Sequence, residues 1–99
     1  MYDYTGWIVR ANAGRDKEGI FFVVGVDQEG HRLLLADGKR RKASRPKRKK
    51  LGHVCCLTDH LHMYDNPVVR SLQQGEPVSD RALRRALAAF KEGYTLGER

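Results

Sequence analysis

The sequence predicts a mainly β fold, a small barrel of short strands followed by a short C-terminal α-helical segment. Two observations favour this fold. Between residues 7 and 57, short β-prone stretches alternate with turn signals rich in glycine, aspartate and asparagine, a pattern typical of small sheets and barrels. Between residues 79 and 93, apolar residues instead recur with a helical period. At 99 residues, the chain has room for one small domain with a modest core.

The first two expected strands cover residues 7–11 and 20–26, and a polar loop with a glycine near each end joins them. Residues 20–26 are apolar on both faces. This segment should therefore be the central strand of a curled sheet. Gly25 should mark a bend or a bulge within it.

Side chains alternate between the two faces of a strand, so one set should fill the barrel. We expect this interior set to be Trp7, Phe22, Val24 and Leu34. Phe21 and Val23 should then lie on the opposite face, where they meet the helix.

The chain then turns at residues 27–30 and continues as a third strand over residues 31–36. Asp37-Gly38 is a strong signal for a two-residue hairpin. It should send the chain straight back as a fourth strand made of basic residues. Pro46 lacks a backbone N–H, so it should interrupt the pairing in the middle of that strand.

Residues 51–57 are expected to form a fifth strand, with Val54 and Cys56 on one face. Cys55 and Cys56 are adjacent, and neighbouring cysteines rarely bridge each other, so we expect no disulfide. On a strand their side chains point to opposite faces, which prevents them from sharing a metal ion. His60 and His62 could place both rings on one side of a strand, which leaves metal binding as an alternative. Buried thiols and surface histidines are the expected roles, so no metal site is predicted.

The second half of the chain should be helical. Residues 68–74 predict a short helix, and a longer one is expected at about residues 80–92. Ser79 is a good N-cap, and Asp80 in the first turn is favoured by the helix dipole. Gly93 should close the helix. The residues that form its apolar face are Leu83, Ala86, Leu87 and Phe90.

One segment of twelve residues, the basic arm (residues 39–50), carries the positive charge of the chain. It holds nine Lys and Arg residues and no acidic residue, whereas the rest of the chain has ten Lys and Arg against twelve Asp and Glu. Crowded like charges repel each other unless an anion compensates them, and a polyanion does so while releasing its condensed counterions. A solvated, disordered segment and a nuclear-localisation signal are the alternatives.

Three stretches, Gly6–Val9, Ala13–Lys17 and Phe21–Val24, together resemble a KOW motif. Two more stretches, Ala36–Arg41 and Arg45–His53, make the resemblance more specific. They are similar to bacterial KOW-domain RNA-binding proteins related to the archaeal and eukaryotic ribosomal protein L14e group.

The resemblance covers about residues 5–55. It implies an SH3-like β-barrel that binds RNA, commonly ribosomal RNA. The sequence departs from the family at Glu18, which stands where the family has a glycine, and Gly19 follows it. We therefore expect the tight reversal of this loop one residue later than in the family.

The loop also suits RNA on physical grounds. A tight turn at Gly14 lets backbone N–H groups approach a phosphate closely. Arg15 can grip a phosphate bidentately or stack on an unpaired base, and Lys17 acts as a point charge. Asp16 should hold the loop in shape, as an Asx turn or an ion-pair partner. The alternative is an ordinary hairpin loop with solvated charges. The expected RNA-binding residues are Gly14, Arg15, Lys17, Lys39, Arg40, Arg41, Lys42, Arg45, Lys47, Arg48, Lys49 and Lys50.

These patterns predict a monomeric protein that docks on structured RNA, with ribosomal RNA as the expected target and the ribosome or its proteins as further partners. Residues 1–57 should form the barrel, including the basic arm, and residues 58–99 a linker and the helical segment. The arm should be flexible when free and ordered on RNA, because it has little to bury. The competing function is a protein-interaction module of the translation or transcription machinery that uses the barrel and the C-terminal helix.

Other function classes find little support. The sequence has no P-loop or dinucleotide fingerprint and no elbow that would place a nucleophile, so we expect no enzyme, no catalytic residue and no cofactor. No apolar run approaches the roughly 20 residues of a membrane span. The first residues lack the features of a signal peptide, which predicts a cytoplasmic location.

Overall fold

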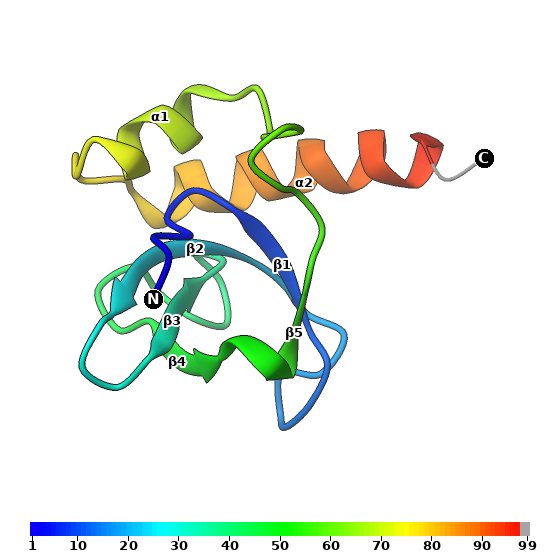
Figure 1. The fold of residues 1–99 in the computed structure, drawn as a ribbon. Coiled ribbons are helices and arrows are strands. Elements are labelled where there is room, and N and C mark those ends of the chain that lie inside the picture. The colour runs from blue at the N-terminus through cyan, green and yellow to red at the C-terminus, as the bar shows by residue number, and fades with distance from the viewer. Residues whose placement is uncertain (98–99) are drawn as a thin grey trace.

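The computed structural model describes residues 1–97, with side chains through residue 93. A curled, five-stranded antiparallel sheet is covered on one face by two helices (Figure 1). The strands are β1 (Ile8–Ala11), β2 (Ile20–Asp27), β3 (Arg32–Ala36), β4 (Lys47–Lys50) and β5 (Val54–Cys56). The helices are α1 (Pro67–Gln73) and α2 (Asp80–Gly97), and a 3₁₀ turn, η1 (Leu51–His53), joins β4 to β5. The predicted mainly β, barrel-like fold is confirmed at this level.

The strand order is β4-β3-β2-β1-β5, so the chain meanders from β1 to β4 and then returns to place β5 beside β1. As predicted, β2 lies at the centre of the sheet, and it is also the longest strand. The pairing of β2 with β3 shifts register between Val23 and Gly25, which confirms the bulge expected at this glycine. A bulge increases the local twist of the strand and helps the sheet to curl.

The two faces of β2 are the reverse of those predicted. Phe21 and Val23 are buried inside the curled sheet with Trp7, whereas Phe22 lies on the other face, beneath the helices. Leu34 and Val24 are only partly buried. Because β2 is apolar on both faces, its sequence contains no signal that fixes which set points inward.

The predicted hairpin at Asp37-Gly38 is wrong. Residues 37–46 form a longer β3–β4 loop, and β4 begins only after Pro46. Asp37 Oδ1 accepts hydrogen bonds from the backbone N–H groups of Lys39 and Arg41, both at 2.9 Å. Asp37-Gly38 therefore does form a turn, but this turn lies within the β3–β4 loop and does not join two paired strands. Pro46 precedes the strand, where a missing N–H costs no ladder hydrogen bond.

The fifth strand is shorter than predicted, because residues 51–53 form η1 before the chain pairs with β1. Val54 is buried and Cys56 is exposed, although the two share a face by alternation. Both cysteines are free thiols.

The helices complete a second apolar layer. Asn66 caps α1 by accepting a hydrogen bond from Val68 N at 2.9 Å. Ser79 caps α2 as predicted, since its Oγ accepts from Ala82 N at 3.1 Å. The predicted end of α2 at Gly93 is wrong, because the helix continues to Gly97. A glycine inside a helix costs only about 1 kcal/mol relative to alanine, so it need not end one.

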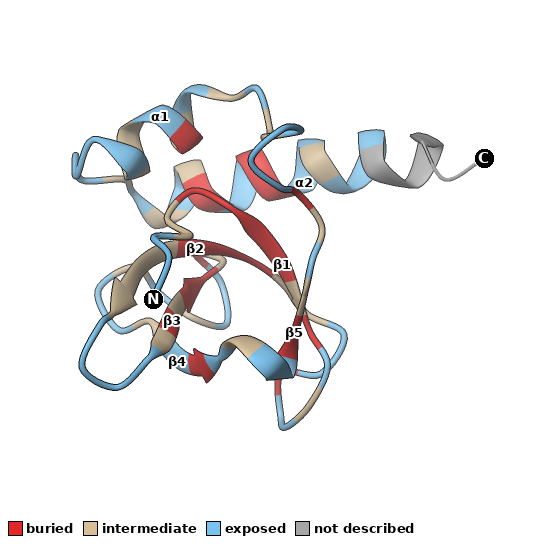
Figure 2. Ribbon diagram, in the orientation of Figure 1, coloured by how far each residue is buried: buried red, intermediate tan, exposed pale blue. Residues whose placement is uncertain are grey.

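Figure 2 shows the buried residues of α2 on the side that faces the sheet. The apolar face predicted for α2 is the one that packs there, with Leu83, Ala86 and Leu87 buried and Phe90 partly buried. They meet Phe22 and the outer residues of the sheet. Within residues 1–97, neither helix combines the length and the apolar character needed to cross a membrane.

Candidate nucleic-acid interface

The β1–β2 loop (residues 12–19) reverses at Glu18. The φ angle of Glu18 is 73°, in the left-handed region where glycine is favoured, and Gly14 has a φ of 81°. Glu18 N donates to Ala11 O at 2.8 Å, which closes the loop onto the end of β1. The expected shift of the reversal to Gly19 is therefore wrong. The glutamate adopts the strained conformation itself, at a cost of about 1–2 kcal/mol.

Asp16 holds this loop against the β3–β4 loop. Its side chain is only 4% exposed and accepts two hydrogen bonds from Arg41, at 2.8 Å from one terminal nitrogen and 3.2 Å from Nε. This bidentate hydrogen bond and the charge of Arg41 lower the pKa of the Asp16 carboxyl, against the opposing effect of burial. The predicted role of Asp16 as an ion-pair partner is confirmed.

Two further contacts join the same segments. A terminal nitrogen of Arg40 donates to the backbone oxygen of Arg15 at 3.5 Å. Lys49 Nζ lies 3.0 Å from the point that a Cβ would occupy on Gly14, so the amine would have to shift slightly to admit a larger residue there. Segments about 25 residues apart in sequence thus form one continuous surface.

Lys49 is the exception among the predicted RNA-binding residues. It is 7% exposed, because it faces into the curled sheet opposite Leu33. The positive charges of Arg41 and Lys49 both lower the pKa of Asp16. Lys49 therefore supports the two loops from within, and it is poorly placed to touch a phosphate.

The basic arm is folded, so the expected flexibility is wrong. Residues 47–50 pair with β3, and helix α2 holds the loop before them. Asp80 Oδ1 accepts from Ala43 N at 2.7 Å, and a terminal nitrogen of Arg84 donates to Gly38 O at 2.7 Å. Gly38, with φ at 78°, packs so closely that a Cβ would collide with the backbone oxygen of Asp80.

Sequence reasoning missed these two supporting residues. Asp80 was assigned only a helix-dipole role, which is local to α2, and no contact was expected of Arg84. Their partners lie 37 and 46 residues away in sequence. No pattern within the helix itself indicates such a partner.

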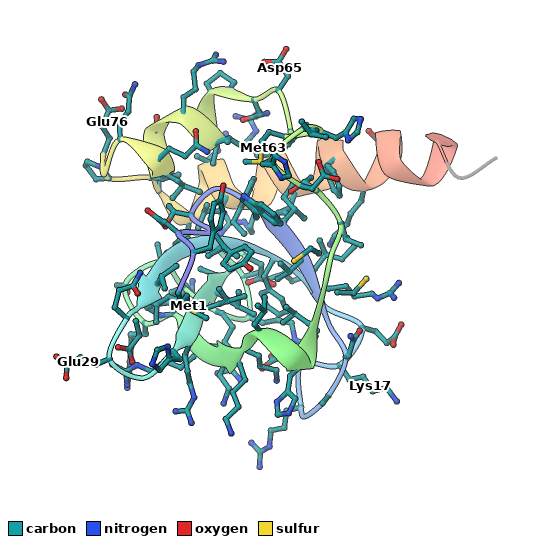
Figure 3. The ribbon with its side chains drawn as sticks, viewed as in Figure 1. Met1, Lys17, Glu29, Met63, Asp65 and Glu76 are labelled. Atoms are coloured by element: carbon teal, nitrogen blue, oxygen red, sulfur yellow. The ribbon has the colours of Figure 1, made fainter. Side chains whose placement is uncertain are left out.

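The other predicted cations remain available to solvent. Arg41 is partly exposed beside Asp16, and Arg48 makes a weak, solvent-exposed pair with Asp27 at 3.7 Å. In Figure 3, Lys17 lies on the β1–β2 loop, far from α1, and side chains ending in nitrogen project from β4 away from α2. The exposed cations of the two loops and β4 are Arg15, Lys17, Lys39, Arg40, Lys42, Arg45, Lys47, Arg48 and Lys50.

No protein-family model matches this chain. A comparison with curated proteins also finds no significant match. The resemblance to KOW proteins therefore depends on the motif residues alone.

The cysteine and histidine residues form no comparable site. Among the residues that the structure describes, no three metal-ligating side chains gather. Partial desolvation, with a smaller effect of Cys55, raises the pKa of the Cys56 thiol, which leaves less of the reactive thiolate at neutral pH. His62 is exposed and pairs with Asp59 at 3.2 Å. The absence of a metal and of an enzymatic activity remain predictions.

Proposed function

We propose that the protein binds structured RNA through the surface formed by the β1–β2 loop, the β3–β4 loop and β4. One observation carries the proposal. The ion pair of the buried Asp16 with the partly exposed Arg41 fastens the two basic segments together, and nine exposed cations lie on these adjoining segments. Ribosomal RNA is the target that we propose, following the resemblance to KOW proteins, and the cytoplasm is the corresponding location.

The fold suits this assignment. The chain meanders through four strands and then places the fifth beside the first, an order that supports an SH3-like barrel. The β1–β2 loop of this barrel corresponds to the KOW stretch, with Gly14 in the left-handed conformation that a tight turn needs. We propose that the domain is an SH3-like KOW barrel extended by two helices.

The balance of charge points to a polyanion. Outside the basic arm, acidic residues outnumber basic ones, so the positive field of the protein is concentrated on this surface. Lysines there contact phosphates as point charges, which gives affinity with little sequence preference. Arg15 is exposed beside a glycine turn, where its planar guanidinium can grip a phosphate bidentately or stack on an unpaired base.

The salt dependence of binding tests the proposal. We expect the double variant Lys47→Gln with Lys50→Gln to weaken binding to a folded ribosomal RNA fragment. The slope of log K against log salt should become shallower by about 1.4, from about 0.7 per lost phosphate contact. The matched control, Arg70→Gln with Arg85→Gln, removes the same charge from the helices and should leave the slope unchanged. Wild-type protein without RNA affinity, or equal effects of both variants, would refute the proposal.

One observation favours protein docking as a second candidate function. A groove of about 430 Å³ lies between the sheet, the β3–β4 loop and the helices, and apolar residues such as Leu34, Leu72 and Val78 line most of it. Nuclease treatment of a lysate separates the two functions. Association with ribosomal fractions that disappears with the RNA supports RNA binding, whereas association that resists nuclease supports protein docking.

A further inference from the structure

A second groove, of about 410 Å³, runs between the start of the basic arm and the middle of α2. Three cationic side chains line it, Lys39 from the arm and Arg84 and Lys91 from the helix. Since Lys39 is also the first residue of the basic arm, the groove continues the surface proposed to bind RNA.

The helical period places Arg84 and Lys91 of α2 on the side that lines the groove. Positions 84, 88 and 91 are spaced i, i+4 and i+7, so they lie on one face. Ala88 stands between the two charged residues and is exposed. Its short side chain leaves the groove open. Arg84 is also fixed in direction, since it donates to Gly38 O at 2.7 Å.

The groove also has two acidic residues, Asp37 and Glu92. Asp37 Oδ1 is already engaged, because it accepts from the backbone N–H groups of Lys39 and Arg41. A carboxylate used in this way is partly neutralised by the amide dipoles that it accepts from. The three cations therefore exceed the acidic charge in the groove.

We infer that this groove is a second phosphate-binding site, which guides the backbone of the bound RNA from the basic arm onto helix α2. The inference rests on the proposed function and extends it, because it makes α2 part of the RNA surface. Lys39 links the two sites, so one continuous strand can occupy both. Arg84 holds the β3–β4 loop and Lys91 supplies a charge at the far end of the groove.

Substitution of Ala88 tests the site with little risk to the fold, because the residue is exposed and glutamate and glutamine both favour helix. Ala88→Glu places a negative charge beside the phosphates, whereas Ala88→Gln adds a side chain of the same size without charge. We expect Ala88→Glu to raise the Kd for the ribosomal RNA fragment about tenfold at low salt relative to Ala88→Gln, because like charges are brought together.

Lys91→Gln gives an independent measurement. It should make the salt slope shallower by about 0.7, the effect of one lost phosphate contact. Arg85→Gln removes the same charge from the same helix outside the groove, and it should leave the slope unchanged. Equal affinities of Ala88→Glu and Ala88→Gln would overturn the second site. If the variants of β4 still lowered the affinity in that case, the proposed function would stand; if wild-type protein bound no RNA, both would fall.

Discussion

The ion pair of the buried Asp16 with Arg41 gives the sharpest prediction about this fold. Asp16→Asn keeps the size of the side chain and one acceptor oxygen but removes the charge. Hydrogen bonds to charged groups contribute about 1.5–3 kcal/mol each, and losing one partner of a fully buried pair costs about 3–5 kcal/mol. Because Arg41 is 30% exposed, water compensates part of this loss. We therefore expect the free energy of unfolding to fall by about 1.5–3 kcal/mol.

Urea denaturation followed by fluorescence measures this change. Trp7 is the only tryptophan of the chain and is buried in the sheet, so its emission reports on the fold directly. Urea is uncharged and does not screen the ion pair, unlike guanidinium chloride. The control is Asp65→Asn, which breaks a solvent-exposed pair with Arg70 at 3.6 Å and should leave the stability unchanged. Equal stabilities of the two variants would show that the pair does not fasten the loops.

The same pair has a signature in pH. The pKa of Asp16 is lowered in the folded protein, below the value of 3.8 that the carboxyl has when unfolded. The folded state therefore holds fewer protons than the unfolded state between these two pKa values. The stability from this pair is fully present above pH 3.8 and is lost as the pH falls through the folded pKa. The difference between wild type and Asp16→Asn should shrink over that range, and a constant difference would contradict the assignment.

Two further predictions concern the interior. Lys49→Gln should lower the free energy of unfolding by about 1 kcal/mol and leave RNA affinity unchanged, because the amine is buried beside the β1–β2 loop. Lys50→Gln, on the exposed face of the same strand, should leave the free energy of unfolding unchanged and lower the RNA affinity. Truncation after Asn66 removes the helices that cover one face of the sheet, so the fragment should lose its cooperative urea transition and bind a dye for exposed apolar surface. A fragment that unfolds cooperatively would show that the sheet needs no helix.

Elements with a local cause were predictable from the sequence. The cap at Ser79, the bulge at Gly25 and the central position of residues 20–26 follow from single residues or short patterns, and each is present. The inward face of β2 was not predictable, because both faces are apolar. Neither was the end of α2, because one glycine inside a helix costs only about 1 kcal/mol and the helix continues through it to Gly97.

The candidate interface also has features that the sequence predicts and features that it does not. A run of lysines and arginines is visible in the sequence, but the pleat that turns Lys49 inward depends on how β4 pairs with β3. The role of Asp16 was predictable, since a carboxylate in a cationic loop needs a partner. That the partner is Arg41 was not, because the choice depends on two loops meeting in three dimensions.

The order of the basic arm has a consequence for the thermodynamics of binding. An arm that folds on its ligand loses conformational entropy at that moment, and burial during coupled folding gives a large negative change in heat capacity. Here the pairing of β4 and the contacts of Asp80 and Arg84 order the backbone before any ligand arrives. That entropy is lost once, during folding, so the complex forms with only side chains left to immobilise. Calorimetry on this protein should therefore give a heat-capacity change close to that of two rigid surfaces meeting.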